Sequence, residues 1–70
     1  MKIMIIVEQT QTGYSAYAPD VPGCIATGES RAEVERTMQE ALEFHLEALR
    51  EDGIVVTEPE SYATIVEVAA

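Results

Sequence analysis

The sequence predicts a small α+β domain with the element order βββαβ. Three observations lead to this fold. Residues 3–28 contain three short β-type stretches separated by turn signals, residues 31–52 contain neither proline nor glycine, and residues 62–68 alternate again as a strand does. We expect an antiparallel three-stranded meander, one helix packed on one sheet face, and a final strand parallel to the first.

The first three stretches differ in character. Residues 3–7 are continuously apolar and rich in β-branched side chains, which is typical of a central strand covered on both faces. A polar turn ending in Gly13 leads to the second strand, Tyr14 to Ala18, whose side chains point alternately to the two faces. The third strand is short and covers about Ile25 to Gly28.

The connection between the second and third strands is rigid. Pro19 and Pro22 fix φ near −65° and remove two backbone donors. Asp20 supplies a side-chain acceptor, and Gly23 tolerates positive φ. The chain is therefore expected to reverse before Cys24, which we interpret as a small buried residue at the start of a strand.

A long helix follows, and both of its ends are marked. Ser30 and Glu33 have the spacing of a capping box, and Gly53 is the C′ residue that ends a helix over 31–52. Apolar positions recur every three or four residues and predict the stripe that faces the sheet. They are Val34, Met38, Ala41, Leu42, His45 and Leu49.

The last strand is expected at Tyr62–Val68. Because the helix is a crossover connection, we expect this strand to return parallel to the first one. No second helix is available to cover the opposite face of the sheet. Exposed apolar strands favour aggregation unless something packs on them, so a partner surface is predicted there, either for a second copy or for another protein.

The charge balance restricts the partners. The chain has 13 acidic and 4 basic residues, a formal net charge of −9. Such a surface repels phosphate backbones, so we expect no direct nucleic-acid binding. A basic protein is the better electrostatic match, although the acidity could equally serve solubility alone.

Size and cysteine content point to an oligomer without a cofactor. A 70-residue chain forms one small domain whose core is too small to contribute much stability. We therefore expect at least a homodimer, which would bury additional apolar surface. One Cys and one His can form neither an intramolecular disulfide nor a zinc cluster. The N-terminal apolar run is too short for a signal peptide or a membrane span, so we expect a cytoplasmic protein without membrane association.

The pattern YxAYxPDxPGCxATGxS, followed by a long helix, resembles the HicB family of antitoxins. The helix segment at 40–53 and Glu58-Pro59 resemble that family too, so the similarity spans nearly the whole chain. The matching residues in the first motif are Tyr14, Ala16, Tyr17, Pro19, Asp20, Pro22, Gly23, Cys24, Ala26, Thr27, Gly28 and Ser30.

The resemblance implies a partial RNase-H-like fold and a non-enzymatic protein that occludes a basic ribonuclease toxin of the HicA kind. HicB antitoxins usually continue into a C-terminal DNA-binding domain. We interpret residues 1–70 as a single HicB-like domain without one, so operator binding is not carried over. A stand-alone oligomeric HicB-like protein with an unknown ligand is the alternative.

Four residues are predicted to contact a partner. Asp20 lies in a stiff turn and could anchor a basic side chain, or only accept amides of its own turn. Tyr14 and Tyr17 lie on opposite faces of their strand, so one should face outward, as an interface anchor or as simple sheet packing. Glu8, at the end of the first strand, is the fourth.

An enzyme is the least favoured alternative. Glu8 and Glu67 would approach each other if their strands were neighbours, as in a degenerate metal nuclease, but two-metal chemistry needs several convergent carboxylates. Glu33 is committed to the helix cap. His45 has no partners at the spacing of a catalytic triad, and we assign it a structural role, so no catalytic, metal or cofactor residue is predicted.

Overall fold

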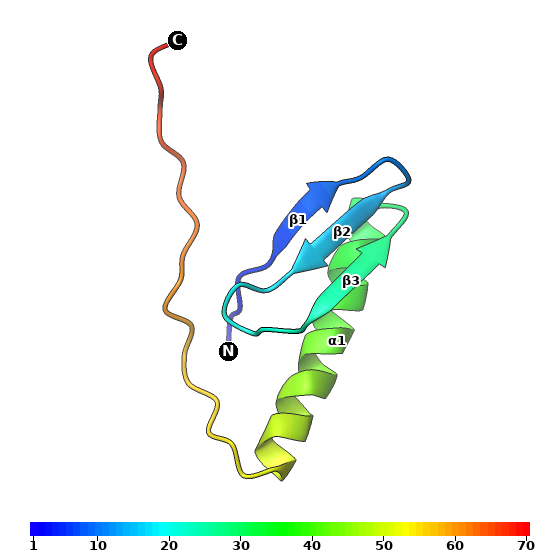
Figure 1. Cartoon of the computed structure of the whole chain (residues 1–70), viewed down its shortest axis with the longest axis vertical. Helices are drawn as coiled ribbons and strands as arrows, with labels where there is room; N and C mark the ends of the chain where they lie inside the picture. Colours follow the sequence, from blue (N-terminus) through cyan, green and yellow to red (C-terminus); the bar gives the residue numbers. More distant parts are fainter.

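A computed structural model describes all of residues 1–70 (Figure 1). Its elements are β1 (Ile6–Gln9), β2 (Tyr14–Tyr17), β3 (Ile25–Gly28) and α1 (Arg31–Glu51). The strands form one antiparallel sheet in the order β1-β2-β3, and α1 lies against one face of it. The predicted α+β class, the meander and the single helix are therefore confirmed. No helix here combines the length and the apolar character that crossing a membrane requires.

β1 is an edge strand and begins later than predicted. The register pairs Ile6 with Tyr17, and continuing it would place Met4 opposite Pro19. Proline has no N–H to donate, so the ladder stops before that pair. The apolar residues ahead of β1 still contribute to the fold, because Ile3 and Ile5 pack against the core. Their continuous hydrophobicity reflects this packing rather than a central strand.

The chain reverses between β2 and β3 through two consecutive turns. The Val21 N–H donates to the Ala18 carbonyl at 3.1 Å, and the Cys24 N–H donates to the Val21 carbonyl at 3.3 Å. Each turn has a proline as its second residue, and Gly23 has a φ of 85° at the third position of the second turn. Proline followed by a positive-φ residue is the pattern of a type II turn.

The N-terminus of α1 is capped, but not by a full capping box. Ser30 is the N-cap, and its Oγ accepts from the Glu33 N–H at 3.1 Å. The Glu33 carboxylate accepts instead from the Glu29 N–H, at 3.4 Å. The predicted reciprocal bond from the Ser30 N–H to the Glu33 carboxylate is therefore wrong. The carboxylate accepts from the N–H of Glu29, one residue earlier.

The C-terminus of α1 turns the chain back along the helix. Asp52 is the C-cap, and Gly53 adopts a φ of 77°. The Ile54 N–H donates to the Leu49 carbonyl at 2.9 Å and the Gly53 N–H to the Arg50 carbonyl at 3.0 Å. This pair of bonds is a Schellman motif, which requires the left-handed residue that glycine supplies.

The core lies between α1 and the sheet. The side chains of Val34 and Met38 are fully buried there. Gly28 allows the close approach, because a Cβ on it would lie 2.8 Å from the Val34 backbone nitrogen. Eight residues are buried in all. They are Ala16, Ala18, Val21, Cys24, Ala26, Val34, Met38 and Leu42.

The final strand predicted at Tyr62–Val68 is wrong for the isolated chain. Residues 54–70, here called the C-terminal arm, contain no secondary structure and run as an extended segment beside the domain (Figure 1). A hydrogen bond from Ser61 Oγ to Asp20 Oδ1 at 2.8 Å holds the arm near its middle. Alternating residues favour a strand only where a neighbouring strand supplies backbone partners, and this segment has none.

Two apolar side chains of α1 provide a matched test of where the core lies. We expect Met38→Ala to lower the free energy of unfolding by about 2–5 kcal/mol, because it opens a cavity at a fully buried site. Phe44→Ala, at a side chain that is 77 % exposed, should change it by less than about 0.5 kcal/mol. Urea unfolding followed by circular dichroism measures both values. Equal effects would contradict the packing described here.

Candidate protein-binding surface

The sheet face opposite α1 is uncovered and carries an apolar band. The register pairs Ile6 with Tyr17 and Tyr17 with Ile25, so these three side chains lie side by side across all three strands. Tyr17 is 43 % exposed and Ile25 is 74 % exposed. We call Ile6, Tyr17 and Ile25 the open-face band. Its apolar area faces solvent in the isolated chain.

A polar row borders this band. Glu8 pairs with Ser15, and Ser15 pairs with Thr27, which places the three side chains in the next row of the same face. Glu8 and Thr27 are exposed. An apolar centre with a polar margin is the usual composition of a protein-binding surface.

The residues predicted to contact a partner fall into three places. Tyr17 and Glu8 lie on the open face, one in the band and one in the polar row. Tyr14 lies on the other face, where it is partly buried and packs against the core. Asp20 lies in the turn at the end of the sheet. The structure therefore brings two of the four together, and their role in binding stays a prediction.

Asp20 uses half of its carboxylate within the chain. Oδ1 accepts from Ser61 Oγ at 2.8 Å, and Oδ2 is buried without a hydrogen-bond partner. Ser61 was not among the predicted site residues. A contact across 41 positions of the sequence leaves no local pattern from which it could have been found.

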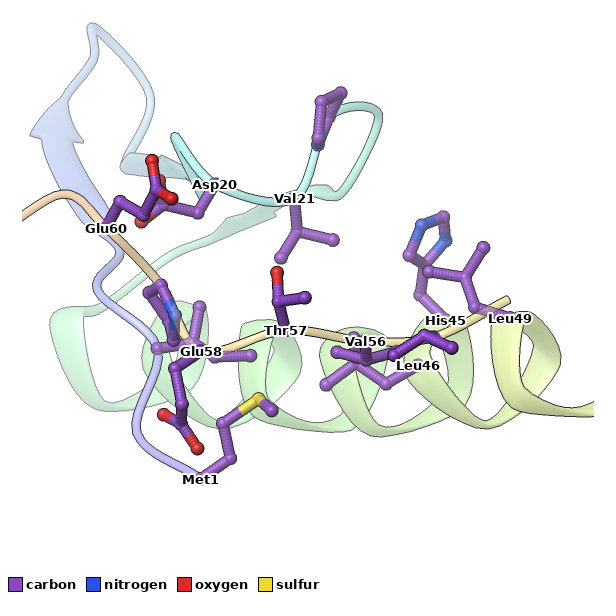
Figure 2. A pocket seen from close by; sticks show the side chains of 14 residues that line it. Met1, Asp20, Val21, His45, Leu46, Leu49, Val56, Thr57, Glu58 and Glu60 are labelled. Atoms are coloured by element: carbon purple, nitrogen blue, oxygen red, sulfur yellow. The ribbon is translucent and has the colours of Figure 1, made fainter. Parts of the chain in front are cut away.

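A cavity of about 560 Å³ separates the arm from the body of the domain (Figure 2). Asp20 and Glu60 lie toward one end of it and His45 and Leu49 toward the other. Its walls come from α1, the turn after β2, the N-terminus and residues 55–60. The partly buried His45 faces this space together with apolar side chains, and the cavity lining contains neither serine nor cysteine.

Phe44 is an exposed aromatic residue that the sequence reasoning did not single out. It lies on the outer side of α1 with 77 % of its surface exposed. Glu40, Glu43 and Glu47 are exposed near it on the same helix. The detectable signal was a phenylalanine outside the apolar stripe, among glutamates at helical spacing.

The carboxylates do not gather into a metal-binding cluster, and Cys24 is buried. No three His, Cys, Asp or Glu side chains cluster closely enough to hold a metal ion. Cys24 is 5 % exposed and is the free cysteine of the core. Burial raises the pKa of its thiol above the ordinary value, so the thiolate is disfavoured at neutral pH.

The fold and the surface define a small α+β domain with one covered and one open sheet face. Residues 2–69 match the HicB-like antitoxin family of bacterial toxin–antitoxin systems. The chain belongs to this family.

Two individual proteins are similar in sequence to this chain. An uncharacterized 14.9 kDa protein from the rep-hol intergenic region of Haemophilus phage HP1 is 40% identical over 48 residues, which cover 69% of this chain and 36% of that protein. A UPF0150 protein of Helicobacter pylori is 35% identical over 54 residues, covering 77% of this chain and 75% of that one. The chain therefore spans only about a third of the phage relative.

A solved structure shares the fold. A chain of the HicA3 and HicB3 toxin–antitoxin complex superposes with a TM-score of 0.65 at 31% sequence identity. The match covers 84% of this chain and 72% of that one. The likeness confirms the HicB-like α+β fold.

The burial of Cys24 leads to a reactivity prediction. Iodoacetamide at pH 8 should modify the native protein at least about tenfold more slowly than the urea-unfolded chain, because the buried thiol stays protonated. Mass spectrometry measures both rates. Because burial raises the pKa of the folded Cys24 thiol above 9.0, the folded protein holds this proton more tightly than the unfolded chain does. The contribution of this group to the free energy of unfolding is therefore fully present below pH 9.0 and is lost as the pH rises through the folded pKa. Equally fast modification of native and unfolded protein would contradict the burial.

Proposed function

We propose that this protein is an antitoxin that binds a basic ribonuclease toxin of the HicA kind and covers the catalytic histidine and RNA-binding face of that toxin. Membership of the HicB-like antitoxin family supports the class of function. The observation that supports the mode of action is the open sheet face with its apolar band. We place this interaction in the cytoplasm, where a ribonuclease toxin meets its RNA.

The open-face band has the composition of a binding hot spot. Tyr17 lies at its centre, between Ile6 and Ile25, and aromatic residues at the centre of an interface often contribute most of the binding energy. Glu8 and Thr27 form part of the polar margin and are available for hydrogen bonds with a partner. The band is continuous across the sheet, so one partner surface can cover it without any rearrangement of the backbone.

Charge favours a basic partner. The formal net charge is −9, and a protein that binds RNA must present Lys and Arg to phosphates. Opposite surface potentials accelerate association and exclude acidic partners. Occlusion of this kind is stoichiometric and requires no catalytic group in the antitoxin.

Co-expression tests the proposal. We expect a neighbouring gene to encode a small basic protein that arrests growth when expressed alone, and we expect the present protein to restore growth and co-purify with that product. A toxic neighbour that is neither bound nor neutralised would overturn the antitoxin assignment.

Two substitutions locate the binding surface. Tyr17→Ala and Ile25→Lys should each weaken toxin binding by at least about tenfold, because they remove or charge the centre of the open-face band. Phe44→Ala removes an exposed aromatic residue of α1 and serves as the matched control, with unchanged affinity. Isothermal titration calorimetry measures the three dissociation constants. A loss of affinity confined to Phe44→Ala would move the binding surface to the helix.

Ionic strength should act mainly on the association rate. Raising NaCl from about 50 mM to about 500 mM should slow association with the toxin several-fold, because salt screens the attraction between the acidic surface and a basic partner. Surface plasmon resonance separates the two rate constants. An association rate that does not change with salt would contradict electrostatic steering.

A further inference from the structure

The cavity between the arm and the domain has one acidic end. Asp20 and Glu60 lie toward that end in Figure 2, and Glu58 also lines the cavity. Ser61 brings the first two together, because it follows Glu60 in the chain and donates to Asp20 Oδ1 at 2.8 Å. The lining contains no lysine or arginine that would neutralise these carboxylates. The negative charge at this end of the cavity is therefore available to a cation.

The two other titratable groups of the lining lie apart from Asp20. His45 lies toward the opposite end of the cavity. Met1, which carries the terminal amine, is well separated from Asp20 in the view of Figure 2. The chain itself therefore places no cationic group against the Asp20 carboxylate.

Asp20 gives the acidic end a specific acceptor. Its Oδ1 accepts from Ser61, whereas its Oδ2 is buried and no donor of the chain reaches it. A buried carboxylate oxygen without a donor is unfavourable, because it has lost its hydration and has gained no hydrogen bond in return. An ammonium group supplies both a donor and the opposite charge. Oδ2 is therefore the atom of this cavity that an ammonium ligand would satisfy.

The remaining walls of the cavity are largely apolar. Seven of its fourteen lining residues are hydrophobic, so a ligand that fills it needs an apolar body. Val21 from the turn after β2 and Leu46 and Leu49 from α1 are among them (Figure 2). The volume of about 560 Å³ lies within the range of small-molecule sites, roughly 300–1,000 Å³. Size and lining together suit a small organic ligand with a charge at one end.

The arm forms a wall that can move to admit such a ligand. Val56 and Pro59 are the only residues of the arm that are partly buried, and all the others are exposed. The bond from Ser61 to Asp20 is the side-chain hydrogen bond that ties the arm to the domain. A segment with so few buried contacts opens without unfolding of the sheet or of α1. Opening of the arm therefore gives a ligand access to the buried Oδ2.

We propose that this cavity binds a primary monoamine whose ammonium group donates to Asp20 Oδ2 and whose apolar body packs against Val21, Leu46 and Leu49. A carboxylic acid is excluded by the carboxylates at the acidic end, and a second ammonium group would lie among apolar side chains. The open-face band does not line this cavity, so the proposal does not depend on toxin binding.

Tryptamine is a suitable probe, because the chain contains no tryptophan and indole emission then comes only from the ligand. Tryptophol has the same indole body with a hydroxyl in place of the ammonium group. Fluorescence titration of the full chain at physiological salt should show that tryptamine binds at least about tenfold more tightly than tryptophol, through its charge-assisted hydrogen bond. No binding of tryptamine, or equal binding of the two compounds, would overturn the proposal.

Two substitutions that each remove one negative charge separate the site from the general acidity. Asp20→Asn keeps an oxygen that accepts from Ser61 but removes the charge, and it should weaken tryptamine binding at least about tenfold. Its affinity for tryptophol should not change, which shows that the cavity is still formed. Glu35→Gln, at an exposed residue of α1 outside the cavity, is the matched control and should bind tryptamine as the native chain does. Equal affinities of the two variants for tryptamine would overturn the proposal.

Nuclear magnetic resonance locates the ligand. The ring current of the indole should produce the largest chemical-shift changes at Val21, Leu46 and Leu49, which line the cavity. Changes concentrated at Tyr17 and Ile25 would mean that the indole packs on the open-face band instead, and would overturn the proposal.

Discussion

The packing of one helix on one face of a three-stranded sheet determines the remaining features of this protein. Val34 and Met38 are fully buried against a sheet whose facing residues are small, and Val7, Ala16 and Ala26 form the row beneath α1. Small residues allow the helix to lie close, so a short chain can bury two large side chains completely. The same helix cannot cover the other face. What remains exposed on that face follows from strand geometry, because alternate residues must point away from the helix.

Local signals in the sequence predicted much of the fold. The two-proline turn, the Ser30 cap and Gly53 each act through the conformation of a few neighbouring residues, and such effects can be recognised in a short window. The alternation of Tyr14–Tyr17 likewise predicted that one of the two tyrosines faces outward, and the structure shows that it is Tyr17. These predictions depend on the backbone preferences of single residues and on side-chain periodicity, and both can be read directly from the sequence.

Long-range relations were predicted less well. The final strand required a partner edge, and propensity alone does not show whether the chain supplies that edge itself. The position of β1 at the edge depends on the strand order, and the contact between Ser61 and Asp20 depends on the path of the arm. Phe44 was not predicted for a different reason: a single aromatic residue outside the apolar stripe of the helix adds nothing to the periodic pattern. The sequence predicted that the sheet face opposite the helix is uncovered. The three residues of its apolar band could be identified only once the pairing register of the strands was known.

The open face and the cavity beside the arm are separate parts of one small domain, and they suit different kinds of contact. A face provides a broad set of side chains and therefore selects a protein partner by shape and charge. A cavity encloses its ligand and therefore selects by size and by a few polar groups. This division would let the protein bind a small amine without losing the surface proposed for the toxin.

The central claim is that the open face is where a toxin binds. Titration of the labelled protein with the unlabelled toxin, followed by nuclear magnetic resonance, tests it residue by residue. We expect the largest chemical-shift changes at Ile6, Tyr17 and Ile25, with small changes at Phe44 and Glu43. Changes concentrated on the outer side of α1, with the open-face band unaffected, would contradict it.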